Sequence, residues 1–233
     1  MAMTKFINKM GVEIEGAWYN GQPYGLKSDS SVRARADYHG ESVSDPIGSF
    51  RELTKFITDN YPEEKDESCG LHVHFSFNSL GYYSMLMDKG FMPYFSKFMK
   101  EWGETNAIRD THFWERLNDR NRFCRREVNP DQQVIHRDRG YSRYTQWNYA
   151  WGVHKTAECR VLPVFASVKN AVKAVSAVRR CVGLWLGRVN KPGELESVEL
   201  PMLPPEPEQL IIPGSEDSPF NIQPLIIKEI SCV

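Results

Sequence analysis

The segment GVEIEG at residues 11–16 alternates apolar and acidic residues, and this pattern constrains the fold more than any other part of the chain. In a β-strand, successive side chains point to opposite faces, so Val12 and Ile14 share one face and Glu13 and Glu15 share the other. Two carboxylates on one face repel each other unless a cation lies between them. The segment therefore predicts a strand with one face in a core and the other in a charged site.

Two later segments repeat this alternation of polar and apolar residues. In LHVHF, His72 and His74 share one strand face, and in AECRV, Glu158 and Arg160 do the same. If the three strands belong to one sheet, six polar side chains converge on one surface. These side chains are of the kinds that bind metal ions and phosphate groups.

The composition fits one folded domain. The chain has 233 residues, of which 41% are hydrophobic, and this is enough to bury a substantial core. A net charge of −1 argues against general binding to nucleic acid or to a membrane surface. Five cysteines without paired spacing indicate reduced thiols, so we expect a cytoplasmic protein. We expect the folded domain to span residues 1–200, followed by a proline-rich, extended or disordered tail over 201–233.

Three stretches carry apolar residues at helical spacing. The first begins at Ser44 or Asp45, with Pro46 in its first turn, and continues to Tyr61. The second covers residues 80–102 with a break near Gly90. The third covers residues 165–190 and has the most regular apolar stripe.

Between Arg109 and Arg143 the sequence contains nine arginines and no lysine. Arginine presents a planar fork of donors that binds carboxylate or phosphate through two parallel hydrogen bonds. A surface laced with ion pairs explains the same composition, because acidic residues are interspersed. The sequence leaves both interpretations open.

The three alternating strands suggest phosphoryl-transfer chemistry. Mg²⁺ takes oxygen ligands, so a strand carrying Glu13 and Glu15 is suited to bridge two such ions. Glu158 would complete the ligand set, and Arg160 would contact the phosphate oxygens. His74 would bind metal or position another group. Each pair taken alone is also common on a solvated strand face or as a cross-strand ion pair.

Six segments in order carry a resemblance to a known family: GVEIEG, LKSDSS, HGESVSDPI, SCGLHVHFS, RYTQWN and HKTAECRVLP. The sequence resembles the amidoligase family, carboxylate–amine ligases related to γ-glutamylcysteine synthetase and, more distantly, to glutamine synthetase. The resemblance covers roughly residues 8–190. Compact members of this family occur in bacteriophage genomes, which makes a phage origin an expectation as well.

The resemblance implies an α+β fold of the glutamine synthetase type. A curved, mainly antiparallel sheet would carry the active site on one face and helices on the other. The implied activity is ATP-dependent formation of an amide or isopeptide bond through an acyl phosphate. It requires ATP and two or more Mg²⁺ ions, with Mn²⁺ as a substitute. The substrates would be a small-molecule or protein carboxylate and an amine. No nucleic-acid or membrane partner is expected, and the oligomeric state is left open.

The resemblance also assigns roles to residues. Its metal ligands are Glu13, Glu15, Glu41, His74 and Glu158. Its catalytic residues are Arg160, Glu158 and Glu13. Its nucleotide-binding residues are Arg160, Lys155, Arg143 and Asn148. Asp29 is a weaker member of the same acidic ring, and His72 is expected only to line the mouth of the pocket.

Two alternatives from other classes remain. One is a zinc or iron enzyme, a hydrolase or oxygenase, that uses His72, His74 and Glu158, because neighbouring strand histidines often bind transition metals. The other is a binding or assembly protein of the phage type that keeps the fold without turnover.

Overall fold

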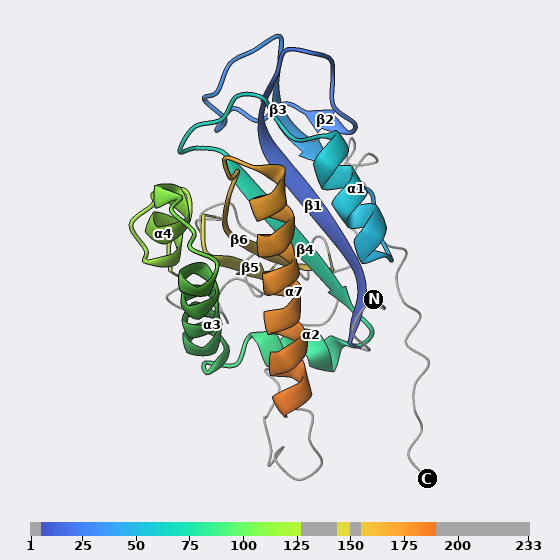
Figure 1. The fold of residues 1–233 in the computed structure, drawn as a ribbon. Coiled ribbons are helices and arrows are strands. Elements are labelled where there is room, and N and C mark those ends of the chain that lie inside the picture. The colour runs from blue at the N-terminus through green and yellow to red at the C-terminus, as the bar shows by residue number, and fades with distance from the viewer. Residues whose placement is uncertain (1–5, 127–143, 150–154, 190–233) are drawn as a thin grey trace.

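The computed structural model describes residues 6–126, 144–149 and 155–189. Its centre is a six-stranded antiparallel sheet with the strand order β2-β3-β1-β4-β6-β5 (Figure 1). The strands are β1 (Ile7–Trp18), β2 (Leu26–Lys27), β3 (Tyr38–Val43), β4 (Gly70–Phe77), β5 (Trp147–Tyr149) and β6 (Ala157–Pro163).

The three alternating segments predicted from the sequence do lie in this sheet. Strand β1 pairs with β4, and Glu13 lies opposite His72. Strand β4 pairs in turn with β6, and His74 lies opposite Glu158. Residues opposite each other in an antiparallel pair point to the same face. The polar side chains of all three strands therefore share one face, as predicted.

Helices cover the opposite, apolar face. The described residues form five helices: α1 (Phe50–Asp59), α2 (Leu80–Leu86), α3 (Phe91–Thr105), α4 (Thr111–Leu117) and α7 (Val168–Val189). Figure 1 shows α7 crossing in front of the sheet, with α1 on one side of it and α3 on the other. The fold is α+β with a helical layer on a single sheet.

The core lies between these two layers. Val12, Ile14, Val73 and Val161 on the sheet are fully buried, and so is Val178 on α7. Burying one such side chain contributes about 1.5–3 kcal/mol relative to leaving it in water. The alternation of the strands therefore holds the polar side chains on the other face.

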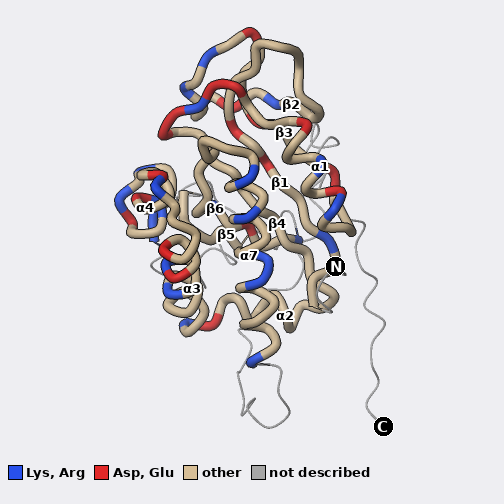
Figure 2. The backbone as a smooth tube through the Cα atoms, in the orientation of Figure 1, with Lys and Arg blue, Asp and Glu red and all other residues tan. Residues whose placement is uncertain are grey.

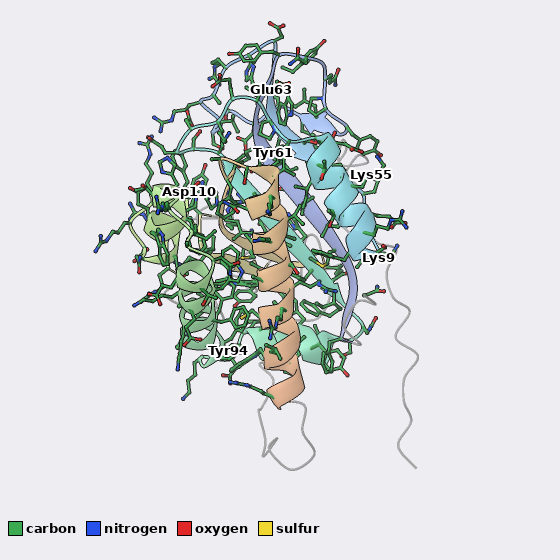
Figure 3. The ribbon with its side chains drawn as sticks, in the orientation of Figure 1. Lys9, Lys55, Tyr61, Glu63, Tyr94 and Asp110 are labelled. Carbon is green, nitrogen blue, oxygen red and sulfur yellow. The ribbon has the colours of Figure 1, made fainter. Side chains whose placement is uncertain are left out.

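A hydrogen bond ties the end of α1 to the start of α7. The hydroxyl of Tyr61 donates to the carbonyl of Phe165 over 2.8 Å, and Figure 3 shows Tyr61 beside one end of α7. This hydrogen bond thus connects the segments next to the two helices. In α7, all charged residues are basic, and they appear as blue segments along this helix in Figure 2.

The helix predictions are right in type and less accurate in their boundaries. Helix α1 begins at Phe50, later than predicted, because Ile47 pairs with Met10 as an extension of the sheet. The predicted break near Gly90 is confirmed, since it separates α2 from α3. Helix α7 agrees closely with the predicted third helix. Helix α4 was not predicted.

The sheet itself requires one correction. It is open and uncurled, and it does not wrap around a central space as the expected curved sheet would. Its edge strands β2 and β5 have only two and three residues, so little sheet remains at either side to curl inward. The predicted tail over residues 201–233 lies outside the described residues. No described helix has the length and apolar composition that crossing a membrane requires.

Glycine is required where β2 meets β3. Gly40 has a φ of 139°, and a Cβ atom there would lie 2.1 Å from the carbonyl oxygen of Lys27. Gly21 has nearly the same φ, 135°, but a Cβ atom there would meet nothing within 4 Å. The two glycines therefore separate backbone strain from steric collision.

We predict that Gly40→Ala lowers the free energy of unfolding by about 2–4 kcal/mol, because strain and collision add. The matched control Gly21→Ala should cost only about 1–2 kcal/mol, because it introduces strain alone. Urea denaturation of both variants measures the difference. Equal losses would show that the β2–β3 contact does not restrict residue 40.

Candidate functional site

Seven charged or titratable side chains gather on the polar face of the sheet. They come from β1, β3, β4 and β6, and most of them are buried although they are polar. We call this group the charged cluster; it consists of Glu13, Glu15, Glu41, His72, His74, Glu158 and Arg160. The register places Glu15 opposite Glu41, so β3 adds its carboxylate to the same face.

His72 lies at the centre of the cluster. Its Nδ1 is 3.3 Å from an oxygen of Glu13 and 3.3 Å from an oxygen of Glu158. Its Nε2 is 3.7 Å from an oxygen of Glu15 and has no hydrogen-bond partner among the described residues. The side chain is only 1% exposed. The expectation that His72 lines the mouth of a pocket is therefore wrong, because the β1–β4 register brings it opposite Glu13.

Glu158 connects the rest of the cluster. One of its oxygens accepts a hydrogen bond from Nη1 of Arg160 at 2.6 Å, and the other accepts one from Nδ2 of Asn148 at 2.9 Å. His74 lies on the neighbouring strand, with Nε2 3.0 Å from an oxygen of Glu13. In this structure Glu158 and Arg160 contact each other, where the sequence predicted separate partners.

The cluster favours the charged forms of its members. Burial alone would raise the pKa of Glu13, but His74 and His72 outweigh this effect and hold its pKa well below the usual value. Burial likewise opposes the charge of Glu158, and Arg160 with the two histidines lowers its pKa. Burial acts against protonation of His74, yet Glu13 and Glu158 raise its pKa. The protein's own cations thus compensate these two carboxylates.

A second group of carboxylates lacks such compensation. Oxygens of Glu15, Asp29 and Glu41 lie within 4.8 Å of one another. Burial, with Glu13, Asp29 and Glu15 nearby, raises the pKa of Glu41 to about 8, and Lys27 offsets only part of this. A divalent cation would relieve this repulsion better than a proton would.

The donor atoms fit divalent metals at two places. Glu15, Asp29 and Glu41 offer only oxygen, which suits hard cations such as Mg²⁺ and Mn²⁺. Glu13, His72 and Glu158 form the second group, whose donor atoms also lie within 4.8 Å of one another. This group adds an imidazole nitrogen, which suits Mn²⁺, zinc or iron better than Mg²⁺.

The structure thus brings most of the predicted metal ligands together. Each of the four predicted glutamates, and the weaker candidate Asp29, belongs to one or the other of the two groups. The histidine in these groups is not the predicted one: His72 belongs to a group of three, whereas the predicted ligand His74 belongs to neither group. His74 instead contacts Glu13 from the side, which fits a positioning role.

The residues predicted to bind nucleotide lie in different places. Asn148 on β5 is opposite Glu158 and bonds to it. Lys155 lies in the turn before β6 with a left-handed φ of 54°. Arg143 lies outside the described residues. The hollow beside His74 has a volume of about 10 Å³, room for about one water molecule.

Sequence reasoning missed two supports of the cluster. The backbone N–H of Gly70 donates to Glu15 across the strand pair, which orients that carboxylate. Arg116 on α4 is 1% exposed and donates to the carbonyls of Arg160 and Cys69, so it joins β6 to the start of β4. Helical spacing in THFWERL would have placed Arg116 on the buried face, but nothing in the sequence indicates its partners.

The raised pKa of Glu41 predicts a pH dependence of stability. Between its ordinary pKa of 4.5 and about 8, the folded protein holds a proton on Glu41 that the unfolded chain has lost. This contribution to stability is complete below 4.5 and is lost as the pH rises towards 8. In EDTA, Glu41→Gln should therefore be more stable than the wild type at high pH, on the order of 1–2 kcal/mol.

Urea denaturation of the wild type and of Glu41→Gln at several pH values, all in EDTA, tests this prediction. Glu52→Gln on the exposed side of α1 is the matched control and should follow the wild type. If Glu41→Gln and the wild type lose stability in parallel as the pH rises, Glu41 does not hold the extra proton.

Comparison with known proteins gives no match. No protein-family model, no curated protein and no solved structure matches this chain. The resemblance of the six segments therefore stays a prediction from the residues. What the charged cluster does has to be argued from its own geometry.

Proposed function

We propose that this protein is an ATP-dependent carboxylate–amine ligase that forms an amide or isopeptide bond. The observation that carries the proposal is the convergence of five carboxylates, two histidines and one arginine from β1, β3, β4, β6 and the loop after β2. Glu15 and Glu158 are buried, and the other three carboxylates are half-buried. Carboxylates brought together in such number away from water destabilise a fold unless they serve to bind cations.

The reaction has two steps that balance without a further co-reactant. An oxygen of the substrate carboxylate attacks the γ-phosphorus of ATP, and ADP leaves, giving an acyl phosphate. The amine nitrogen then attacks the acyl carbon, phosphate leaves, and the amine loses a proton. Repulsion between a carboxylate and a polyanion is the main barrier, so charge neutralisation and alignment are what the protein supplies.

Divalent metals would supply that neutralisation, held by the two groups of donors. Glu15, Asp29 and Glu41 would hold one ion, and Glu13 with Glu158 would hold another. The N–H of Gly70 keeps Glu15 oriented towards the cluster.

Arg160 is suited to the phosphate side of this chemistry. It is buried beside Glu158, so its guanidinium is held in place and acts in a medium of low dielectric. Cation binding at Glu158 would weaken its hold on Arg160 and release donors of the guanidinium towards the phosphate oxygens. Asn148 fixes the second oxygen of Glu158 in both cases.

The fold is compatible with the glutamine synthetase type that we propose. An antiparallel sheet carries helices on one face and the charged cluster on the other, as the resemblance implies, although the sheet is uncurled where the resemblance implies a curved one. Because the sheet is open, the nucleotide would lie across the sheet face.

Mg²⁺ with ATP should raise the melting temperature of the protein. The gain in stability follows from mass action and amounts to about 2.7 kcal/mol at a hundredfold excess over Kd. Thermal melting with Mg-ATP, with Mg²⁺ alone and with ATP in EDTA measures it. The absence of any shift at saturating Mg-ATP would refute the ligase proposal.

Arg160→Lys should fold but lose function. Lysine keeps the charge beside Glu158 and loses the fork that a phosphate contact needs. We expect at least a tenfold loss of phosphate release, about 1.4 kcal/mol of transition-state stabilisation. The acid and amine for this assay would come from metabolite profiles of cells with and without the protein. The control Arg180→Lys, exposed on α7, should retain full activity.

A second function is favoured by one observation, the position of His72. A histidine between Glu13 and Glu158 would suit zinc or iron as a resident metal, as in a hydrolase or oxygenase. Elemental analysis of the purified protein separates the two proposals. One equivalent of zinc or iron that His72→Ala removes, together with no Mg-ATP shift, would favour the metalloenzyme.

A further inference from the structure

A second charged feature lies outside the charged cluster, in the loop that follows α4. A hollow of about 400 Å³ is lined there by Asp119, Arg120, Asn121, Arg122, Arg125 and Arg126. This volume lies within the range of about 300–1,000 Å³ typical of sites for small molecules. Figure 2 shows basic segments on and around α4, interspersed with acidic ones. We call this feature the arginine hollow.

The arginines of the hollow have no acidic partners in the part of the chain that the structure describes. None of the four guanidinium groups forms an ion pair with a described carboxylate. The carboxylate of Asp119 instead accepts a hydrogen bond from the backbone N–H of Arg126 at 2.6 Å. Four cations therefore line one hollow with a single carboxylate, and that carboxylate is engaged by the backbone.

The loop is held in place by its backbone. The N–H of Arg125 donates to the carbonyl of Tyr144 at 2.8 Å, and the carbonyl of Arg125 accepts from the N–H of Gln146 at 2.7 Å. Asn121 pairs with Cys124 across the turn, and Cys124 is buried. The arginine side chains thus extend from a fixed backbone, which lowers the entropy cost of ordering them around a ligand.

A row of aromatic rings joins the hollow to the charged cluster. The Arg122 guanidinium lies 4.7 Å from the ring centroid of Phe123, and that ring lies 6.1 Å from the ring of Tyr144. The guanidinium of Arg160 lies 5.9 Å from the centroid of the same Tyr144 ring. The hollow and Arg160 are therefore neighbours, separated by two rings.

From these observations we infer that the arginine hollow binds a small polyanion, a molecule with several phosphate or carboxylate groups. Forked guanidinium groups recognise such oxyanions through paired, charge-assisted hydrogen bonds. Phosphates and clustered carboxylates share this chemistry. The site is separate from the proposed metal sites, and it does not depend on the proposed ligase activity.

Binding of two probes to the full chain tests the inference. Tripolyphosphate and citrate are titrated by calorimetry in buffer and protein freed of divalent metal on a chelating resin, because EDTA is itself a polycarboxylate and would compete for the hollow. Without metal, the carboxylates of the charged cluster repel anions instead of binding them through metal. We expect saturable binding of at least one probe. The stronger probe distinguishes a phosphate ligand from a polycarboxylate.

Two variants locate the binding. Arg125→Gln should weaken the stronger probe at least about tenfold, and Arg125→Lys should weaken it too, because the fork is lost while the charge remains. Residue 125 is exposed, and its fold contacts run through its backbone, so both variants should fold. The control Arg180→Gln removes one exposed charge on α7 and should bind the probe normally.

Three outcomes overturn the inference. The first is that neither probe binds saturably. The second is an equal loss in Arg125→Gln and Arg180→Gln, which would show a general charge effect. The third is loss of binding in Arg160→Lys with Arg125→Gln unaffected, which would place the anion at the charged cluster. The ligase proposal is tested separately by Mg-ATP, so either proposal can fail while the other stands.

Discussion

The structure depends on one constraint, which is that buried carboxylates on adjacent strands need cations between them. His74 supplies the first of these beside Glu13, since Glu13 and Glu158 raise its pKa against the effect of burial. Arg160 supplies the second through its contact with Glu158. Removing one partner of such a buried pair typically costs about 3–5 kcal/mol, because the remaining charge stays out of water. The pairing of β1 with β4, and of β4 with β6, is therefore an electrostatic arrangement as well as a hydrogen-bonded one.

The same constraint explains why the cluster is suited to bind cations. Its histidine and arginine compensate Glu13 and Glu158 but leave Glu15, Asp29 and Glu41 close together with little positive charge nearby. The fold accepts this unfavourable arrangement because the apolar face below it is fully buried and well packed. Stability from the core thus supports a locally destabilised site, as is usual where strain or repulsion serves function.

The position of the helices has a further consequence. They cover one face of the sheet, where α7 contacts the site strand β6, and α4 contacts the same strand. Arg116 makes this contact through backbone carbonyls, and Gln146 donates back to the carbonyl of Arg116. The loop after α4 then carries the arginine hollow. Helix α4 therefore connects the charged cluster with the arginine hollow.

Much of the site followed from alternation in the sequence. A strand with polar residues two apart must place them on one face, and so the sharing of faces by Glu13 with Glu15, His72 with His74, and Glu158 with Arg160 needs no tertiary information. The long apolar stripe of α7 was equally clear, because its spacing repeats over many turns. The start of α1 was not clear from the sequence, because a backbone pairing between Ile47 and Met10 competes with the helix.

Only the tertiary structure decided which of these side chains meet. The strand register sets whether His72 or His74 lies opposite Glu13, and a shift along the strand would exchange them without changing the pattern of the sequence. Register also brings Glu41 opposite Glu15, and loop geometry adds Asp29. The uncurled shape of the sheet and the contacts of Arg116 depend on pairings far apart in the chain. Local periodicity determines which face a side chain takes, whereas its neighbours on that face depend on long-range pairing.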